Sequence, residues 1–289
     1  MKSIIACLDN SSLSQAVTEA AIWSAERSLQ TVDSAPLIFL NTVEQQHTLA
    51  TTSYSGMLGL DDAYTLIEDM TALEGEHNKL AIQLGQKLLD TAASQADHLQ
   101  HVRTLQRHGD LNDCLKELVD QTRLVILGRR GEGHEEDRSQ FKALGSHIET
   151  VIRESQHPIV IVPASFKAPA HFMLAYDGRA TAKQAIERII DDGLLKGLSC
   201  HLVTVNNNDQ ATADSLEVAA RRLRDAGFEV QATLLEGNIY HALTDYQAQH
   251  QIELLVMGAF SHSKIKQFFV GSNTLRMIQD QQIPLVIMK

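Results

Sequence analysis

The strongest constraint on the fold of this chain is an internal repeat that runs through nearly its whole length. Five segments of the first half recur in the same order in the second half, which is hard to obtain by chance. The matched pairs are 3–12 and 171–180, 36–43 and 199–206, 102–122 and 230–250, 124–131 and 254–261, and 144–163 and 270–289. The sequence therefore predicts two tandem copies of one domain, at 1–163 and 171–289, joined by an exposed, proline-containing linker.

Within each copy, short apolar runs alternate with longer amphipathic segments. The runs VILG, PIVIVP and LLVMG are typical of parallel strands that are buried on both faces of a sheet. The segments 12–29 and 215–227 have helical spacing, with Ser12 as the expected N-cap of the first and Gly227 as the left-handed residue that ends the second. This alternation predicts an α/β fold with two tandem doubly wound parallel-sheet domains.

The charge balance and the cysteines limit the partners and the compartment. The chain has 25 Lys and Arg against 36 Asp and Glu, a net charge of −11, so we expect it to bind neither nucleic acid nor an anionic membrane surface. Its 3 cysteines show no paired spacing, and no apolar stretch approaches the ~20 residues of a membrane helix. Because an acidic residue follows so soon, at Asp9, we expect no signal peptide and a cytoplasmic protein.

Ligands of open α/β sheets bind at the carboxyl ends of the strands, where the strand order reverses. The residues that close predicted strands are Asp9, Val43 and Gly128 in the first copy and Asp177, Val205 and Gly258 in the second. Each set is therefore expected to surround one crevice. In the second copy the chain continues through Ser261 to another glycine. There Gly271, Ser272 and Asn273 offer backbone N–H groups and a hydroxyl at a predicted helix start, which suits an anion.

The glycine spacing resembles that of a known family. The chain is similar to a tandem universal stress protein, whose ATP-binding members have the motif G-x2-G-x9-G-(S/T) after the fourth strand. The resemblance covers both copies except the segment 44–75, and it implies the adenine nucleotide alpha hydrolase-like fold. As ligand it implies ATP or another adenine nucleotide, with or without Mg. It also implies that Asp9 and Asp177 lie near the base and ribose, and that the second-copy ligand has its base against the Val205 backbone and its phosphates at Gly271.

The first copy departs from the family motif in the length and charge of one loop. Gly128, Gly131, Gly145 and Ser146 are present, but 13 residues (132–144) stand where the family has nine. The acids of this longer loop are Glu132, Glu135, Glu136 and Asp137. Because these carboxylates repel a phosphate at close range, we expect the first copy to be the degenerate one.

The second copy keeps the family spacing, although Ser261 replaces the second glycine. Its loop carries Lys264 and Lys266 and has no acid before the predicted helix, so electrostatics favour nucleotide binding here. A structural alternative is open for these residues. The glycines can serve only to turn the chain, and the two strand-end aspartates can serve only to cap the next helix.

The last strands of the two copies are expected to pair. Each copy ends in an apolar strand with a free edge, and such edges invite association. Members of the family pair these strands antiparallel between subunits. We therefore expect 158–163 to pair with 284–289 inside one chain, which gives an intramolecular pseudo-twofold dimer. A further homodimer of whole chains is left open.

The first copy also carries an insertion, 44–75, beside its crevice. Leaving its apolar side chains, among them Tyr54 and Met57, in water is costly, so we expect the segment to pack down and to cover the first crevice. A lid, a surface for a protein partner and plain extra packing are the alternatives for this segment.

Three functions are compatible with these observations. The first is a stress-response protein that senses or sequesters an adenine nucleotide or another small ligand. The second is a ligand-free interaction scaffold whose crevices are filled by side chains, such as Phe260 and Phe269 in the second copy. The third, an ATP hydrolase, is least favoured because no catalytic set is found. No metal site is expected either, since His98 and His101 are interpreted as a solvated surface pair.

Overall fold

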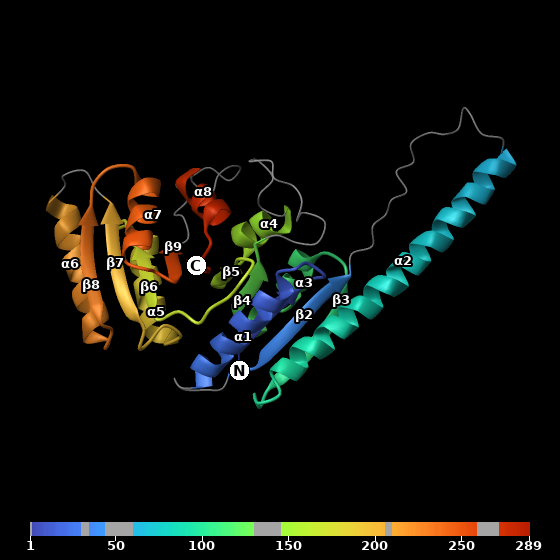
Figure 1. Cartoon of the computed structure of the whole chain (residues 1–289), viewed down its shortest axis with the longest axis horizontal. Helices are drawn as coiled ribbons and strands as arrows, with labels where there is room; N and C mark the ends of the chain where they lie inside the picture. Colours follow the sequence, from blue (N-terminus) through green and yellow to red (C-terminus); the bar gives the residue numbers. More distant parts are fainter. Residues whose placement is uncertain (1, 30–34, 44–59, 130–145, 206–209, 259–271) are drawn as a thin grey trace.

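The described strands of both halves join in one sheet. The computed structural model describes residues 2–29, 35–43, 60–129, 146–205, 210–258 and 272–289. The strands of the first half are β1 Ser3–Leu8, β2 Leu37–Val43, β3 Val102–His108, β4 Thr122–Gly128 and β5 Ile159–Val162. Those of the second half are β6 His171–Ala175, β7 Ser199–Val205, β8 Val230–Leu235, β9 Leu254–Gly258 and β10 Leu285–Met288. The order across the sheet is β3-β2-β1-β4-β5-β10-β9-β6-β7-β8, so each half is doubly wound in the same way, which confirms the predicted fold class (Figure 1).

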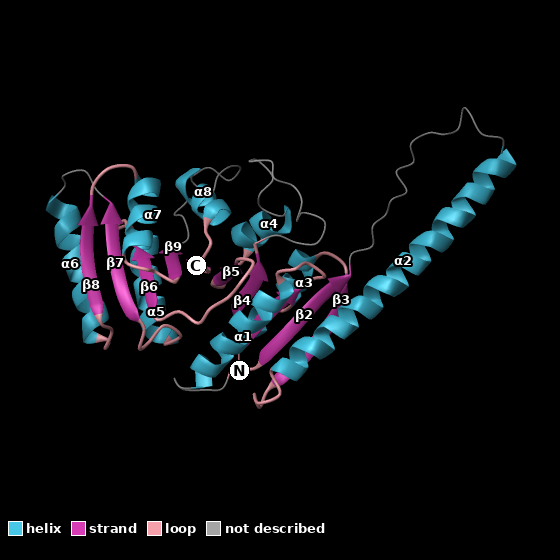
Figure 2. Cartoon of the chain, viewed as in Figure 1, coloured by secondary structure: helices cyan, strands magenta, loops and turns pink. Residues whose placement is uncertain are grey.

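Helices cover both faces of this sheet (Figure 2). They are α1 Ser14–Leu29, α2 Leu60–Gln95, α3 Leu111–Glu117, α4 Ser146–Glu154, α5 Ala180–Asp192, α6 Gln210–Asp225, α7 Ile239–Gln249 and α8 Ser272–Asp280, with a short 3-10 helix, η1 Val119–Gln121, after α3. Apolar residues of α1, α2, α5 and α6 pack in one core, and those of α3, α4, α7 and α8 pack on the opposite face. The two largest cores each contain residues from both halves, so apolar burial runs without interruption across the junction.

The two halves meet at the antiparallel strands β5 and β10 (Figure 1). The paired residues are Ile161 with Leu285, Val160 with Val286, and Ile159 with Ile287. All six side chains are buried. This register confirms the predicted pairing of the two last strands and the pseudo-twofold arrangement within one chain.

Arginine side chains of the first half also bind the second half. Arg123 of β4 donates from Nε to the Asp192 carboxylate at 2.5 Å and from Nη2 to the Asp192 carbonyl at 2.6 Å. Arg129 donates from Nη1 to the carbonyl of Gln279, in the last turn of α8, at 3.1 Å. A cation at this end of a helix satisfies carbonyls that lack a helical partner and complements the helix dipole. The halves are therefore joined by polar bonds as well as by the strand pair.

The linker between the copies is anchored on α1. Phe166 packs on Trp23, with ring centroids 5.8 Å apart. The guanidinium of Arg27 lies 5.4 Å from the centroid of Trp23, and its Nε donates to the carbonyl of Leu194 at 2.7 Å. The segment predicted to be an exposed linker is therefore held in place at Phe166, because an aromatic side chain gains more from packing than from solvent.

Two predicted helix ends can be compared with the structure. The first helix begins at Ser14 rather than directly after Ser12, because the chain first makes a turn in which the Ser14 N–H donates to the Ser11 carbonyl at 3.3 Å. The helix predicted over 215–227 begins earlier, at Gln210. Its end is as predicted, since Gly227 follows it with φ +88°, a conformation that glycine adopts at little cost.

The insertion does not cover the first crevice in the described part of the chain. Residues 44–59 lie outside the described residues, and residues 60–75 open α2, a helix of 36 residues. The second half of α2 packs on the sheet through side chains such as Leu89, whereas its first half extends past the carboxyl ends of the strands (Figure 1). Leu73 is 57% exposed. The expectation of close packing is therefore wrong for 60–75, because a continuous helix carries this segment away from the sheet.

Candidate functional site

The strand order reverses once in each half, between β1 and β4 and between β6 and β9. The register of these strand pairs places Asp9 and Gly128 at the first reversal and Asp177 and Gly258 at the second, on the carboxyl edge of the sheet. This is the position at which open α/β sheets bind ligands. Four of the predicted site residues are thus brought to two switch points, two at each.

Both aspartates order the turn that follows their strand. The Ser11 N–H donates to Asp9 Oδ1 at 3.1 Å, and the Arg179 N–H donates to Asp177 Oδ1 at 3.0 Å. In each half the carboxylate thus accepts a bond from the amide two residues further on, as in an Asx-turn. Both aspartates thus have a structural role, but it is to order the turn, since the N-cap of α5 is Arg179 and not Asp177. A carboxylate has about four acceptor positions, so this role does not by itself exclude a ligand.

The two aspartates differ in their access to solvent. Asp9 Oδ1 also accepts from the Ser11 hydroxyl at 2.6 Å and lies 3.4 Å from the Ser14 hydroxyl, and both serines are buried. The Asp177 side chain is 54% exposed, and its nearest cation, Arg179 Nε, lies 3.7 Å away and is itself exposed. The carboxylate of the second half is thus the more accessible to a small ligand.

Gly258 has a packing role that is independent of any ligand. A Cβ at this position would lie 3.2 Å from the Thr181 carbonyl oxygen and 3.3 Å from the backbone nitrogen of Ala182, both in the first turn of α5. These contacts are tighter than ordinary van der Waals distances, and backbone cannot move aside as a flexible side chain can. The end of β9 therefore needs glycine for the close approach of α5.

Val43 and Val205 close neighbouring strands at positions that are not equivalent. Asn41 Nδ2 donates at 2.9 Å to the carbonyl of Leu8, the residue before Asp9. In the same way, Thr204 Oγ1 donates at 2.8 Å to the carbonyl of Tyr176, the residue before Asp177. Asn41 therefore corresponds to Thr204, and Val43 lies one register position beyond Val205. Because side chains alternate along a strand, the two valines lie on opposite faces of the sheet.

This pair of side-chain bonds is a feature that the sequence reasoning missed. Asn41 and Thr204 are both buried, and each ties the end of the first strand of its half to the second strand. In the first half Gln106 Nε2 extends the tie, since it donates to Asn41 Oδ1 at 3.1 Å and to the Ile82 carbonyl of α2 at 3.0 Å. The sequence does carry a signal for these bonds, since Asn41 and Thr204 are hydrogen-bonding residues at the same position of two matched apolar strands.

The remaining predicted site residues are described in part or not at all. Gly131, Gly145, Ser261 and Gly271 lie outside the described residues. For Ser146, Ser272 and Asn273 only the backbone is described. It shows that α4 begins at Ser146 and α8 at Ser272, which are the helix starts that the sequence predicts.

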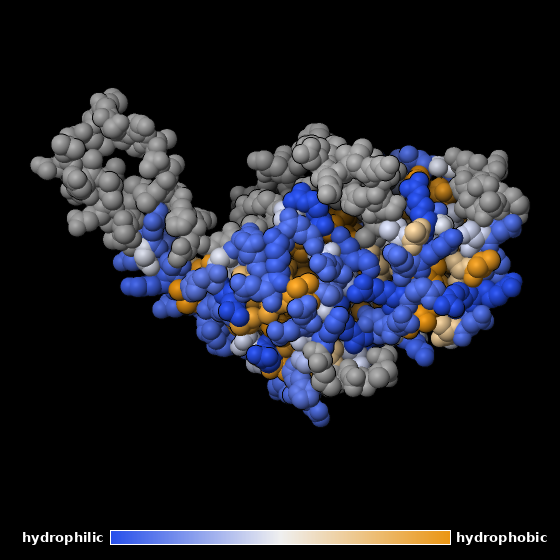
Figure 3. Space-filling view, turned by 180° about the vertical axis from the view of Figure 1, so that it is seen from behind, coloured by the Kyte–Doolittle hydropathy of each residue, from blue (hydrophilic) through white to orange (hydrophobic). Residues whose placement is uncertain are grey.

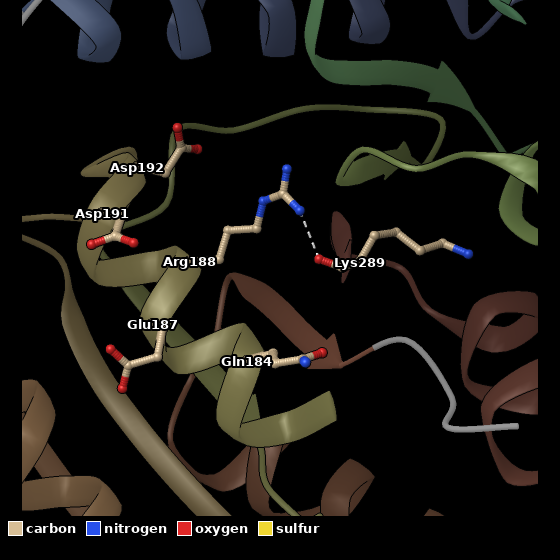
Figure 4. A pocket seen from close by; sticks show the side chains of 6 residues that line it. All are labelled: Gln184, Glu187, Arg188, Asp191, Asp192 and Lys289. Carbon is tan, nitrogen blue, oxygen red and sulfur yellow. Dashed lines mark hydrogen bonds between the residues drawn. The ribbon is translucent and has the colours of Figure 1, made fainter. Parts of the chain in front are cut away.

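A separate hollow of about 480 Å³ lies between α5 and the end of β10 (Figure 4). Its lining residues are all polar or charged: Gln184, Glu187, Arg188, Asp191, Asp192 and Lys289. Arg188 Nη1 donates to the Lys289 carbonyl at 2.7 Å (Figure 4). Asp192 is also the partner of Arg123 across the two halves. None of its lining residues has an aromatic or wholly aliphatic side chain that could pack on an adenine base, so the hollow is unlike a typical nucleotide pocket.

The other chemically active side chains have structural roles. Among the described residues, no group of three or more His, Cys, Asp or Glu is arranged to hold a metal ion. His98 Nε2 lies 2.9 Å from Glu26 Oε1 in an exposed pair. Burial raises the pKa of the Cys7 and Cys200 thiols to about 12, so both thiols stay protonated and unreactive at neutral pH. None of the helices in the described ranges is long and apolar enough to cross a membrane.

The repeat agrees with comparisons to known proteins. A model of the universal stress protein family matches residues 1–163 and 207–289. Universal stress protein Slr1230 from Synechocystis sp. is 30% identical over 290 residues, which cover 99% of this chain and 99% of the relative. The chain belongs to the universal stress protein family. As a universal stress protein, it has the stress response as its general role.

Two crystal structures share the fold of this universal stress protein over its whole length. A universal stress protein from Archaeoglobus fulgidus DSM 4304 matches with a TM-score of 0.63 and 18% identity, over 99% of this chain and 98% of the other. Protein PA1789 from Pseudomonas aeruginosa PAO1 matches with a TM-score of 0.59 and 12% identity, over 100% and 92%. At these identities the likeness concerns the fold, and it agrees with the tandem α/β architecture described above.

Proposed function

We propose that this universal stress protein is a cytoplasmic, non-catalytic protein that binds an adenine nucleotide in its second half and acts as a sensor or regulator. The observation that carries the proposal is the exposed carboxylate of Asp177 at the β6/β9 switch point. The segment that leads from this edge to α8 contains Lys264 and Lys266 and no acid, so its charge suits a phosphate. The first half, by contrast, has a half-buried aspartate and an acidic loop.

Each part of the nucleotide has a proposed contact. Asp177 accepts hydrogen bonds from the ribose, and the backbone of Val205 faces the base. The phosphates of ATP, with or without Mg, lie at the start of α8, where backbone N–H groups and the helix dipole favour an anion. The residues proposed for this site are Asp177, Val205, Gly258, Ser261, Gly271, Ser272 and Asn273. The residues proposed for the degenerate site of the first half are Asp9, Val43, Gly128, Gly131, Gly145 and Ser146, although Val43 is not in register with Val205.

The proposal is tested by isothermal titration calorimetry of the full chain with ATP and with AMP. We expect binding at one site per chain. Gly271→Asp, which places a carboxylate against the phosphates, is expected to abolish it, whereas the matched variant Gly145→Asp in the first half is expected to bind as the unchanged protein does. Loss of binding in Gly145→Asp alone would mean that the first half holds the nucleotide. Unchanged binding in both variants would reject the phosphate position.

A ligand-free interaction scaffold is the second candidate, and two observations favour it. Both aspartates already have a structural role in their turns, and Gly258 is needed for the approach of α5. The two candidates differ in one measurement. Mass spectrometry of small molecules released from freshly purified protein yields an adenine nucleotide for a tight binding protein and none for a scaffold. An ATP hydrolase is not proposed. The domain limits that we propose are 1–163 and 171–289.

A further inference from the structure

The middle of α2, from Leu73 to Leu84, presents three leucine side chains to solvent. Over the described residues, the face in Figure 3 is mostly hydrophilic, with hydrophobic residues in small patches. The exposed large hydrophobic residues are Leu73, Leu80, Leu84, Val218, Leu234 and Ile239, and half of them lie on α2. Leu80 is 54% exposed, although Leu89, only nine positions later, is fully buried against the sheet. These three leucines come before Leu89, where α2 packs on the sheet, and they form an uncovered apolar stripe.

The sequence of this stripe has the spacing of a coiled-coil helix. Positions separated by alternating steps of three and four residues are Ala63, Leu66, Met70, Leu73, His77, Leu80 and Leu84. Six of the seven are apolar, over three heptads, which is the length at which such a pattern becomes diagnostic. His77 is the exception, and a single polar residue in such a seam fixes the register of the partner. This pattern predicts that another helix packs along the stripe.

The charges beside the stripe decide which kind of helix can pack along it. Residues 60–84 contain six acids and one lysine, a net charge of −5. The acids that directly flank the seam are Asp62, Asp69, Glu74 and Glu76, and no base does so. In a pair of identical helices, parallel or antiparallel, these acids would face one another, and like charges across a seam oppose association. A second copy of this chain is thus a poor occupant, and a helix with basic flanks is a good one.

We propose that the acidic leucine stripe of α2, residues 63–84, is a docking surface for an amphipathic helix of a partner protein. The partner helix has an apolar seam at heptad spacing, and lysine or arginine flanks it. Apolar burial supplies affinity, and the opposite charges supply orientation and selectivity. The surface lies on a helix that begins beyond the carboxyl edge of the sheet (Figure 1). This inference does not depend on nucleotide binding.

Two designed peptides test the proposal with the full chain. Both are 28-residue helices with leucine and isoleucine in the seam, one with lysine and the other with glutamate at the flanking positions. Fluorescence anisotropy is expected to show at least tenfold tighter binding of the lysine peptide at 50 mM salt, and weaker binding of it at 500 mM salt. Equal binding of the two peptides, or binding of neither, would overturn the proposal.

Matched variants locate the surface. The double variant Leu73→Gln, Leu80→Gln is expected to bind the lysine peptide at least tenfold more weakly. The control variant Val218→Gln, Leu234→Gln makes the same change at exposed apolar residues elsewhere and is expected to leave the affinity for the peptide unchanged. Asp69→Lys with Glu76→Lys leaves two acids and two lysines beside the seam, so it is expected to abolish the preference for the lysine peptide. This second variant keeps the test informative should the leucine variant unfold. Light scattering, which measures the oligomeric state, tests whether a second copy of the chain occupies the stripe instead. A dimer of the unchanged protein that dissociates in the leucine variant would make a second copy the occupant and refute the proposal.

Discussion

Replacing Arg123 with alanine is expected to destabilise the whole chain, because this side chain joins the two halves. Its guanidinium makes two bonds to Asp192, at 2.5 and 2.6 Å, and the two side chains are only 23% and 19% exposed. The substitution leaves a mostly buried carboxylate without its cation. Breaking a fully buried pair costs about 3–5 kcal/mol, and a hydrogen bond to a charged group contributes about 1.5–3 kcal/mol. Allowing for residual solvent, we expect a loss of about 2–3 kcal/mol in the free energy of unfolding.

The assay is equilibrium unfolding in urea, followed by circular dichroism. Because the two main cores contain residues of both halves, we expect one transition, shifted to lower urea in Arg123→Ala. The control is Arg222→Ala, which removes the exposed pair with Glu187 inside the second half and is expected to leave the midpoint unchanged. Equal midpoints for Arg123→Ala and the unchanged protein would refute the reasoning, as would two separate transitions in the latter.

Three other outcomes follow from the packing. Gly258→Ala, whose Cβ would meet the α5 backbone at 3.2 Å, is expected to cost about 1–3 kcal/mol in urea unfolding without any ligand; an unchanged midpoint would show that this glycine has no packing role. Val286→Asp at the β5/β10 junction is expected to make the halves separately sensitive to limited proteolysis, and a variant as resistant as the unchanged protein would contradict the role of the strand pair. Burial, and next the charges of His250 and His171, lower the pKa of His201 below its usual value of 6.5. The unfolded chain therefore binds the proton at higher pH than the folded chain, and the free energy of unfolding falls as the pH drops below about 6.5. His201→Gln is expected to flatten the dependence of unfolding free energy on pH between 7.5 and 5.5, and an unaltered dependence would assign it to other groups.

Repetition made the fold predictable from sequence. Each strand could be identified twice, and the apolar edges of the two last strands indicated that they pair. The starts of α4 and α8, at Ser146 and Ser272, were also predictable, since a glycine precedes a residue that suits a helix start. These features depend on local sequence signals that both copies share.

The junction between the halves was not predictable in the same way. Arg27 and Arg129 bind backbone carbonyls of the other half, and a carbonyl acceptor has no sequence signature. The sequence offered ligand approach or a chain turn as the role of Gly258, because its contact with α5 depends on a packing distance that spacing does not show. The extension of α2 was not predicted, although the heptad from Ala63 to Leu84 is present in the sequence, because the apolar side chains of the insertion indicated that it packs down on the crevice.

Photolabelling with 8-azido-ATP, followed by peptide mapping, tests most directly whether the second half binds an adenine nucleotide. The azide reacts with residues next to the base, so the labelled peptide identifies the half that holds the ligand. We expect the label in a peptide of 171–289 that contains Asp177 or Val205, and we expect excess unlabelled ATP to suppress it. Labelling confined to 1–163, or the absence of any labelling that ATP suppresses, would contradict nucleotide binding in the second half.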